Sequence, residues 1–174
     1  MSGDAKVGGL VGRGNYVDIN NSYVVANVNG DGDRIGGLIG DSTYVNINNS
    51  YAIGNVNGSG DYIGGLVGVG TSGIIDNSYA NGNVSGDSSV GGLVGWGSSA
   101  NISNSYWNNV SGNPGICVGG GSPTSEDCTA IDDNEAYFYD VSNTPMDVWD
   151  FVGVWDDVYD GVDFAPLLWQ GEVL

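Results

Sequence analysis

Carboxylates crowd the C-terminal part of the chain and are the side chains best placed there to do chemistry. Four of them fall close together in the sequence: Asp156, Asp157, Asp160 and Asp163. Hard cations prefer six to eight oxygen ligands, so this segment is a candidate calcium site. The alternative is a charged, solvated loop that binds no metal, in which case no cofactor is expected.

Acid–base catalysis has little support in the sequence. Two adjacent pairs of acids, Asp132 with Asp133 and Asp156 with Asp157, are the candidates for it. Glycosidases need two carboxylates about 5–9 Å apart across a cleft, whereas neighbouring residues on a strand point to opposite faces. The chain has no histidine, which removes the Ser-His-Asp and Cys-His nucleophile systems. We therefore expect a protein that is not an enzyme.

A tyrosine recurs at a nearly constant interval and forms a candidate ligand-binding row: Tyr23, Tyr51, Tyr79 and Tyr106. The flat face of an aromatic ring can stack on the apolar face of a pyranose, so the row is a candidate sugar platform. The alternative is that the stacked rings only stabilise a sheet through contacts between neighbouring strands.

Two cysteines, Cys117 and Cys128, lie in a segment rich in Gly, Ser and Pro. Zinc sites draw on several Cys and His ligands, and the chain offers no His and no second Cys pair. A disulfide between the two cysteines, in an exported protein, is the better interpretation.

The elements that position these residues are set by an internal repeat. GGLVG at 8–12 returns as GGLIG at 36–40 and as GGLVG at 64–68 and 91–95, in steps of 28, 28 and 27 residues. A four-residue element ending in Ser-Tyr keeps the same step. Self-similarity at a fixed period of this length indicates a repeat architecture. We predict an all-β fold, a β-solenoid of about four coils similar to a parallel β-helix.

Each repeat contains two strand-like pieces separated by turn-forming residues. The GGLVG piece has apolar residues on both faces, as in a strand buried on two sides. The second piece alternates, as Ser50–Val56 shows, and its small residues suit the interior while Tyr and Asn suit an outer face. Equivalent positions then stack between coils. We expect a leucine row inside, an asparagine row at a turn and the tyrosine row outside. The leucine row contains Leu10, Leu38, Leu66 and Leu93, and the asparagine row contains Asn21, Asn49, Asn77 and Asn104.

The charge balance limits the possible partners. Asp and Glu number 21 against three Lys and Arg, for a net charge of −18 at pH 7. Nucleic acids and anionic membranes need basic residues on the contact face, so neither is an expected partner. No apolar run is long enough for membrane insertion. The first residues lack a signal peptide, and we expect Met1 to be an artificial start within a longer natural chain.

The tandem GGLVG and INNSY elements resemble the GLUG repeat, named for its Gly-Leu-Val/Ile-Gly core. The resemblance covers residues 7–112 and extends through SYW at 105–107 to FAPLLW at 164–169. GLUG repeats occur in large exported surface proteins of bacteria and archaea, including adhesins. The resemblance therefore implies a fold-forming unit at the cell surface and, as a tendency, a role in adhesion. The two cysteines are not part of the family pattern.

We divide the chain into solenoid repeats at 1–112, a disulfide-pinned loop at 113–130 and a C-terminal cap at 131–174. The cap is predicted because an uncovered last coil exposes apolar area and unpaired backbone groups. Its aromatic and apolar residues are expected to cover the open end or one flank of the solenoid: Trp149, Phe151, Trp155, Phe164, Leu168 and Trp169.

The sequence favours a non-catalytic structural and adhesive module of an exported, extracellular or cell-surface protein. Surface glycans or another surface protein are its expected partners. One alternative is a carbohydrate-binding or carbohydrate-active β-helix fragment that uses the tyrosine row and the tail carboxylates. Another is a repeat segment of a filament or viral fibre, which stacks end to end through its N-terminal coil.

Overall fold

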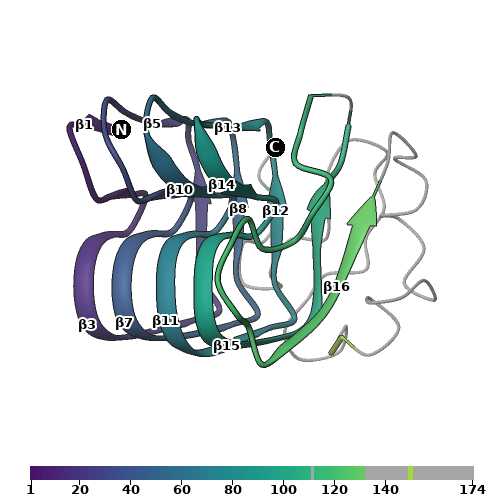
Figure 1. Ribbon diagram of the computed structural model, residues 1–174. Helices are drawn as coiled ribbons and strands as arrows, with labels where there is room; N and C mark the ends of the chain where they lie inside the picture. The colour runs from purple at the N-terminus through teal and green to yellow at the C-terminus, as the bar shows by residue number, and fades with distance from the viewer. Residues whose placement is uncertain (111, 132–148, 151–174) are drawn as a thin grey trace, which may run out of the picture.

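The chain winds into a stack of parallel β-coils. The computed structural model describes residues 1–110, 112–131 and 149–150. Figure 1 shows the coils following one another from the N-terminal end, in purple, to β16, in green. Every strand pairing in this part of the chain is parallel, and the fold is all-β, which confirms the predicted β-solenoid. The described residues contain no helix long and apolar enough to cross a membrane.

The longest wall of the stack is built from one ten-residue strand in each of the first three coils and from the first part of β15 in the fourth. These strands are β3 (Val11–Asn20), β7 (Ile39–Asn48), β11 (Val67–Asp76) and β15 (Val94–Asn108). The register joins Ile47 to both Ile19 and Ile75, and Ile75 to Ile102. The structure therefore has the steps of 28, 28 and 27 residues that the repeat predicts.

Shorter strands complete each coil. One group continues the long wall and ends on β15: β4 (Tyr23–Val25), β8 (Tyr51–Ile53) and β12 (Tyr79–Asn81). A four-stranded sheet contains β1 (Ser2–Gly3), β5 (Val28–Gly30), β9 (Val56–Gly58) and β13 (Val84–Ser85). A second contains β2 (Val7–Gly8), β6 (Ile35–Gly36), β10 (Asp61–Gly64) and β14 (Ser88–Gly91).

Two kinds of corner let the coils stack closely. A Cβ at Gly37 would collide with the carbonyl oxygen of Gly65 in the next coil, so this corner requires glycine. The predicted asparagine row forms the other corner, where Asn49 has a φ of 49° and its amide donates to Asn21 at 3.2 Å. Asparagine tolerates this left-handed conformation better than most residues.

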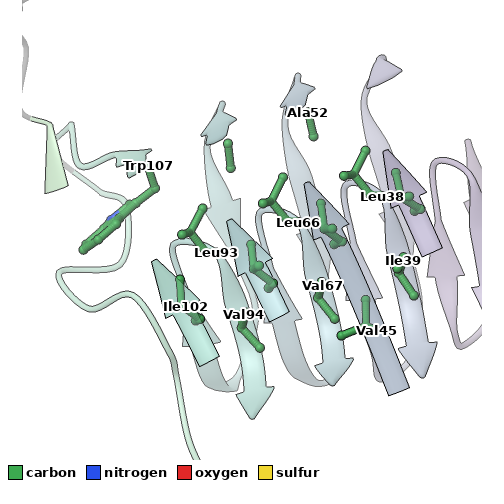
Figure 2. Close-up of a cluster of buried hydrophobic side chains, with 14 of the residues drawn as sticks. Leu38, Ile39, Val45, Ala52, Leu66, Val67, Leu93, Val94, Ile102 and Trp107 are labelled. Atoms are coloured by element: carbon green, nitrogen blue, oxygen red, sulfur yellow. The ribbon is translucent and has the colours of Figure 1, made fainter. Parts of the chain in front are cut away.

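The core lies between the walls as rows that run along the stack. Figure 2 shows Leu38, Leu66 and Leu93 in one such row, and all three are fully buried. Leu10, which we predicted inside with them, is 46% exposed. Leu10 belongs to the first coil, so a neighbouring coil covers its side chain on one side only. Trp107 takes the register of Ala80 and fills the cross-section near the other end.

The segment that we predicted to be a loop, 113–130, continues the stack as a shortened fifth coil. The backbone N–H groups of Leu93 and Val94 donate to the carbonyl of Cys117, as those of Leu66 and Val67 donate to Leu93. Cys117 thus occupies the leucine row. The strand β16 (Ser125–Ile131) then pairs with β15 in parallel and places Cys128 beside Ser105.

The predicted disulfide between Cys117 and Cys128 is present, with the two Cα atoms 6.5 Å apart. It connects the leucine row, which Cys117 continues, to the serine row that ends at Ser105, beside Cys128. The bond therefore crosslinks two parts of the fifth coil.

Candidate functional site

The candidate site lies where the corner before the glycine pair meets the long wall. Three neighbouring columns of the repeat come together there, one at the corner and two on the long wall. The corner column contains Lys6, Arg34, Tyr62 and Ser89. The strand column contains Arg13, Asp41, Val69 and Trp96. The threonine column contains Asn15, Thr43, Thr71 and Ser98.

These three columns border a surface groove of about 330 Å³. We call it the arginine–tryptophan groove, and its lining comprises Arg13, Gly14, Arg34, Asp41, Thr43, Tyr62, Val69, Thr71 and Trp96. Its volume lies within the range of small-molecule binding sites. The groove follows the stacking direction, because its lining residues come from four successive coils at nearly the same place in the repeat.

One end of the groove is charged. The Nη1 of Arg34 donates to the Oδ2 of Asp41 at 2.9 Å, and the Nε of Arg13 lies 3.5 Å from the same oxygen. The Asp41 side chain is 12% exposed, whereas those of Arg13 and Arg34 are 64% and 40% exposed. Two guanidinium groups thus share one carboxylate, and the cluster carries one net positive charge.

The other end of the groove is aromatic. Tyr62 and Trp96 meet edge to face, with ring centroids 5.7 Å apart and planes at 78°. Trp96 is 37% exposed. A Cβ at Gly120, in the fifth coil, would lie 2.9 Å from the Cε3 of Trp96, so the absence of a side chain there makes room for the indole. The edge-to-face contact holds both rings in a fixed orientation at the mouth of the groove.

The corner column owes its placement to backbone conformation. Arg34 and Tyr62 both have a φ of 65°, and Lys6 and Ser89 have 58° and 51°. This left-handed turn precedes the glycine pair in every coil and sets the corner residue beside the strand column of the long wall. Because all four coils share it, the turn belongs to the coil and is not a local distortion at the groove.

The tyrosine row occupies a different flank, and its rings stack as predicted. Successive centroids from Tyr23 to Tyr106 are 5.2, 4.7 and 4.9 Å apart. The row is covered, however, since Tyr51, Tyr79 and Tyr106 are 3%, 0% and 0% exposed, whereas a sugar platform needs exposed rings. Binding of sugars to this row stays a prediction, and a bound sugar would have to displace the groups that cover these rings.

Part of that cover is Trp149, from the predicted cap. Its ring centroid lies 5.3 Å from that of Tyr106, and its Nε1 donates to the carbonyl of Asn104 at 2.9 Å. Burial, together with the nearby Tyr51, raises the pKa of the Tyr106 hydroxyl well above its usual value. Trp149 thus lies on a flank of the solenoid, which is one of the two positions that we predicted for the cap residues.

The remaining cap residues lie outside the described residues, as do the four aspartates of the candidate calcium site and both acids of the Asp132–Asp133 pair. Within the part of the chain that the structure describes, no group of three or more Cys, Asp or Glu side chains comes together to hold a metal. Calcium binding by Asp156, Asp157, Asp160 and Asp163 therefore stays a prediction.

Comparison with known protein families adds one finding. The GLUG motif matches residues 59–85, which run from the turn before β10 through β13 and make up one full coil. Residues 59–85 therefore form a GLUG repeat. The other coils carry the same glycine corners and leucine row in the same register. No curated protein and no solved structure shows a significant match to the chain.

The groove was not predicted from the sequence, where Arg13 and Arg34 counted only toward the net charge. The signal was present in the repeat. The corner and strand columns vary in charge, size and aromaticity from coil to coil, while the leucine and asparagine columns stay constant. What the sequence lacked was the adjacency of the corner and strand columns, because Arg34 and Asp41 are seven positions apart along the chain.

Proposed function

We propose that the GLUG array is a non-catalytic structural and adhesive module of an exported cell-surface protein. The supporting observation is the parallel pairing that continues from the first coil to β16, with one register shift between Ile102 and Ser105. Hydrogen bonds between stacked Asn side chains reinforce it. Each added coil lengthens such a stack by about 4.8 Å without changing its cross-section. A module of this kind is a spacer of defined length, and its walls present side chains at regular intervals.

The disulfide supports the exported part of the proposal. Disulfides persist in oxidising compartments and are rare where thiols are kept reduced. The bond between Cys117 and Cys128 lies in the interior of the fifth coil, where Cys117 is buried. A coil closed in this way suits a protein that folds or remains outside the cytosol.

The proposal is tested on intact cells that express the protein. Antibodies against the folded array are expected to label unpermeabilised cells, and brief external proteolysis is expected to remove the label. Beads coated with the oxidised array are expected to bind surfaces that carry the partner glycan or protein. Label that appears only after permeabilisation would overturn the surface assignment, and beads that bind no better than albumin-coated beads would overturn adhesion.

End-to-end assembly is a second candidate function, favoured by the first coil. The strands β1, β2, β3 and β4 each lie at the end of their sheet. Leu10 is half-exposed there, and Val25 and Tyr16 are exposed. An edge of this kind is a template for pairing with another chain.

A further inference from the structure

We propose that the arginine–tryptophan groove binds an acidic saccharide, with the sugar carboxylate on Arg13 and Arg34 and a pyranose face on Trp96. The biological meaning of this site rests on the proposed adhesive function. The binding itself is a property of the groove and is argued from its geometry. Nothing in the buried tyrosine row is required for it.

The distribution of charge points to an anionic group on the ligand. The chain has three basic residues and a net charge of −18, yet two of the three face the same groove. One arginine suffices to pair with Asp41, and exposed ion pairs contribute little to stability. The second arginine, 64% exposed, is therefore surplus to the structure. A guanidinium presents five N–H donors in a planar fork that matches a carboxylate, and most of these donors remain available.

The other groups in the groove point to a sugar. Trp96 and Tyr62 offer aromatic surface in a fixed orientation, and Thr43 and Thr71 place hydroxyl-bearing side chains between the two ends. From Arg13 to Trp96 the strand column crosses three coil steps, roughly 14 Å at the usual strand spacing. The groove is thus longer than one pyranose, and it offers donors at one end and a stacking face at the other.

The overall charge limits how acidic the ligand is. A chain of −18 repels polyanions over distances of about a Debye length, and the groove contributes one net positive charge against that field. The fitting ligand is therefore an oligosaccharide with a single carboxylate beside neutral rings, as opposed to a sulfated chain or a nucleic acid.

A matched pair of probes isolates the carboxylate. Isothermal titration of the full oxidised chain uses a xylotriose with one glucuronic acid branch and, in parallel, the methyl ester of the same sugar. We expect the free acid to bind about tenfold more tightly, because the ester forms no charge-assisted hydrogen bonds. Its affinity is expected to fall as salt is raised, while that of the ester stays constant.

Paired variants assign the binding to the groove. Arg34→Asn keeps a residue that tolerates the left-handed corner, and Lys6→Asn makes the same change one coil earlier, outside the groove lining. We expect Arg34→Asn and Arg13→Gln to abolish the preference for the acid, and Lys6→Asn to retain it. Trp96→Leu is expected to weaken both probes, whereas Tyr16→Leu, at an exposed tyrosine outside the groove, leaves both unchanged. Thermal unfolding of each variant verifies folding.

Three results would overturn the site. They are equal binding of acid and ester, equal effects of Lys6→Asn and Arg34→Asn, and absence of binding by a folded chain at millimolar acid. Such a failure leaves the surface function standing if intact cells are labelled. Conversely, the protein could be absent from the cell surface while the groove still binds the acid and every variant behaves as expected. That result would contradict the proposed function and would support the binding site.

Discussion

At the scale of single residues, buried serine hydroxyls connect neighbouring coils. The N–H of Ser50 donates to the Oγ of Ser78 at 3.1 Å, and that hydroxyl donates to the carbonyl of Asp76 at 2.8 Å. Ser78→Ala leaves a buried N–H without its acceptor, which costs about 1–3 kcal/mol. We expect a lower urea midpoint by circular dichroism. Ser22→Ala is the control, because its hydroxyl lies at the exposed edge, and an equal loss there would contradict the argument.

Tyr106 makes the stability of the fold depend on pH in the alkaline range. The pKa of Tyr106 is raised in the folded chain, so above about pH 10 the unfolded state releases a proton that the folded state retains. The stabilising contribution is therefore complete below pH 10 and is lost as pH rises toward the folded pKa. We expect the urea midpoint to be flat from pH 8 to about 10 and then to fall.

Replacement by phenylalanine separates this effect from general alkaline damage. Tyr106→Phe removes the titrating hydroxyl and is expected to shallow the fall above pH 10, whereas Tyr16→Phe, at an exposed ring, leaves it unchanged. If the two variants show the same pH profile, Tyr106 is not the group responsible.

Residue rows were predictable from the sequence to the extent that they repeat. Leu38, Leu66 and Asn49 fell where the period placed them, because a constant step fixes the register of a parallel stack. The burial of Tyr79 was not predictable, because part of its cover, Trp149, comes from beyond the repeats. The groove escaped for the opposite reason, since Arg13, Asp41 and Trp96 have nothing in common as residue types.

At the scale of elements, the fifth coil stacks on the fourth although its sequence has diverged from the repeat motif. It follows the fourth after 24 residues, from Leu93 to Cys117, and Ile-Cys-Val-Gly at 116–119 is the main trace of the motif. Sequence periodicity alone cannot recover so short a match. The fifth coil still stacks on the fourth, because parallel pairing needs only backbone N–H and C=O groups and a side chain that fits the leucine row.

The register of the fifth coil predicts how its disulfide can be replaced. Cys117 stands in the leucine row and Cys128 beside Ser105, so Cys117→Leu with Cys128→Ser restores what the other coils carry. Loss of the crosslink costs roughly 3 kcal/mol in the chain-entropy model. We expect this variant to recover part of that cost relative to the double alanine variant, which leaves a cavity.

Hydrogen exchange measures the outcome coil by coil. In the double alanine variant we expect protection to fall in β16 and to persist in β11, because each coil depends mainly on its neighbours. A uniform loss of protection, or a Leu/Ser variant no more stable than the alanine variant, would contradict this placement of the two cysteines.

At the scale of the whole molecule, the stack is asymmetric. Its first coil ends in four edge strands and carries the half-exposed Leu10, while the described part of the other end holds the disulfide-closed coil and Trp107. The chain has a net charge of −18, and repulsion between chains opposes contact at low salt. Association through the first coil is therefore controlled by ionic strength.

The edge of the first coil is expected to pair with the same edge of a second copy. An interface that uses one surface twice is isologous and closes at a dimer, so no filament follows from it. Sedimentation velocity at rising concentration is expected to show monomers in about 0.01 M salt, where the Debye length is near 30 Å, and dimers in about 1 M salt, where it is near 3 Å.

Leu10→Asp places a charge at the edge of the first coil and is expected to keep the chain monomeric at every salt concentration. Ile116→Asp makes the same change at an exposed position of the fifth coil and is expected to leave the dimer intact. Dimers that persist in Leu10→Asp, or species larger than dimers, would rule out pairing through this edge.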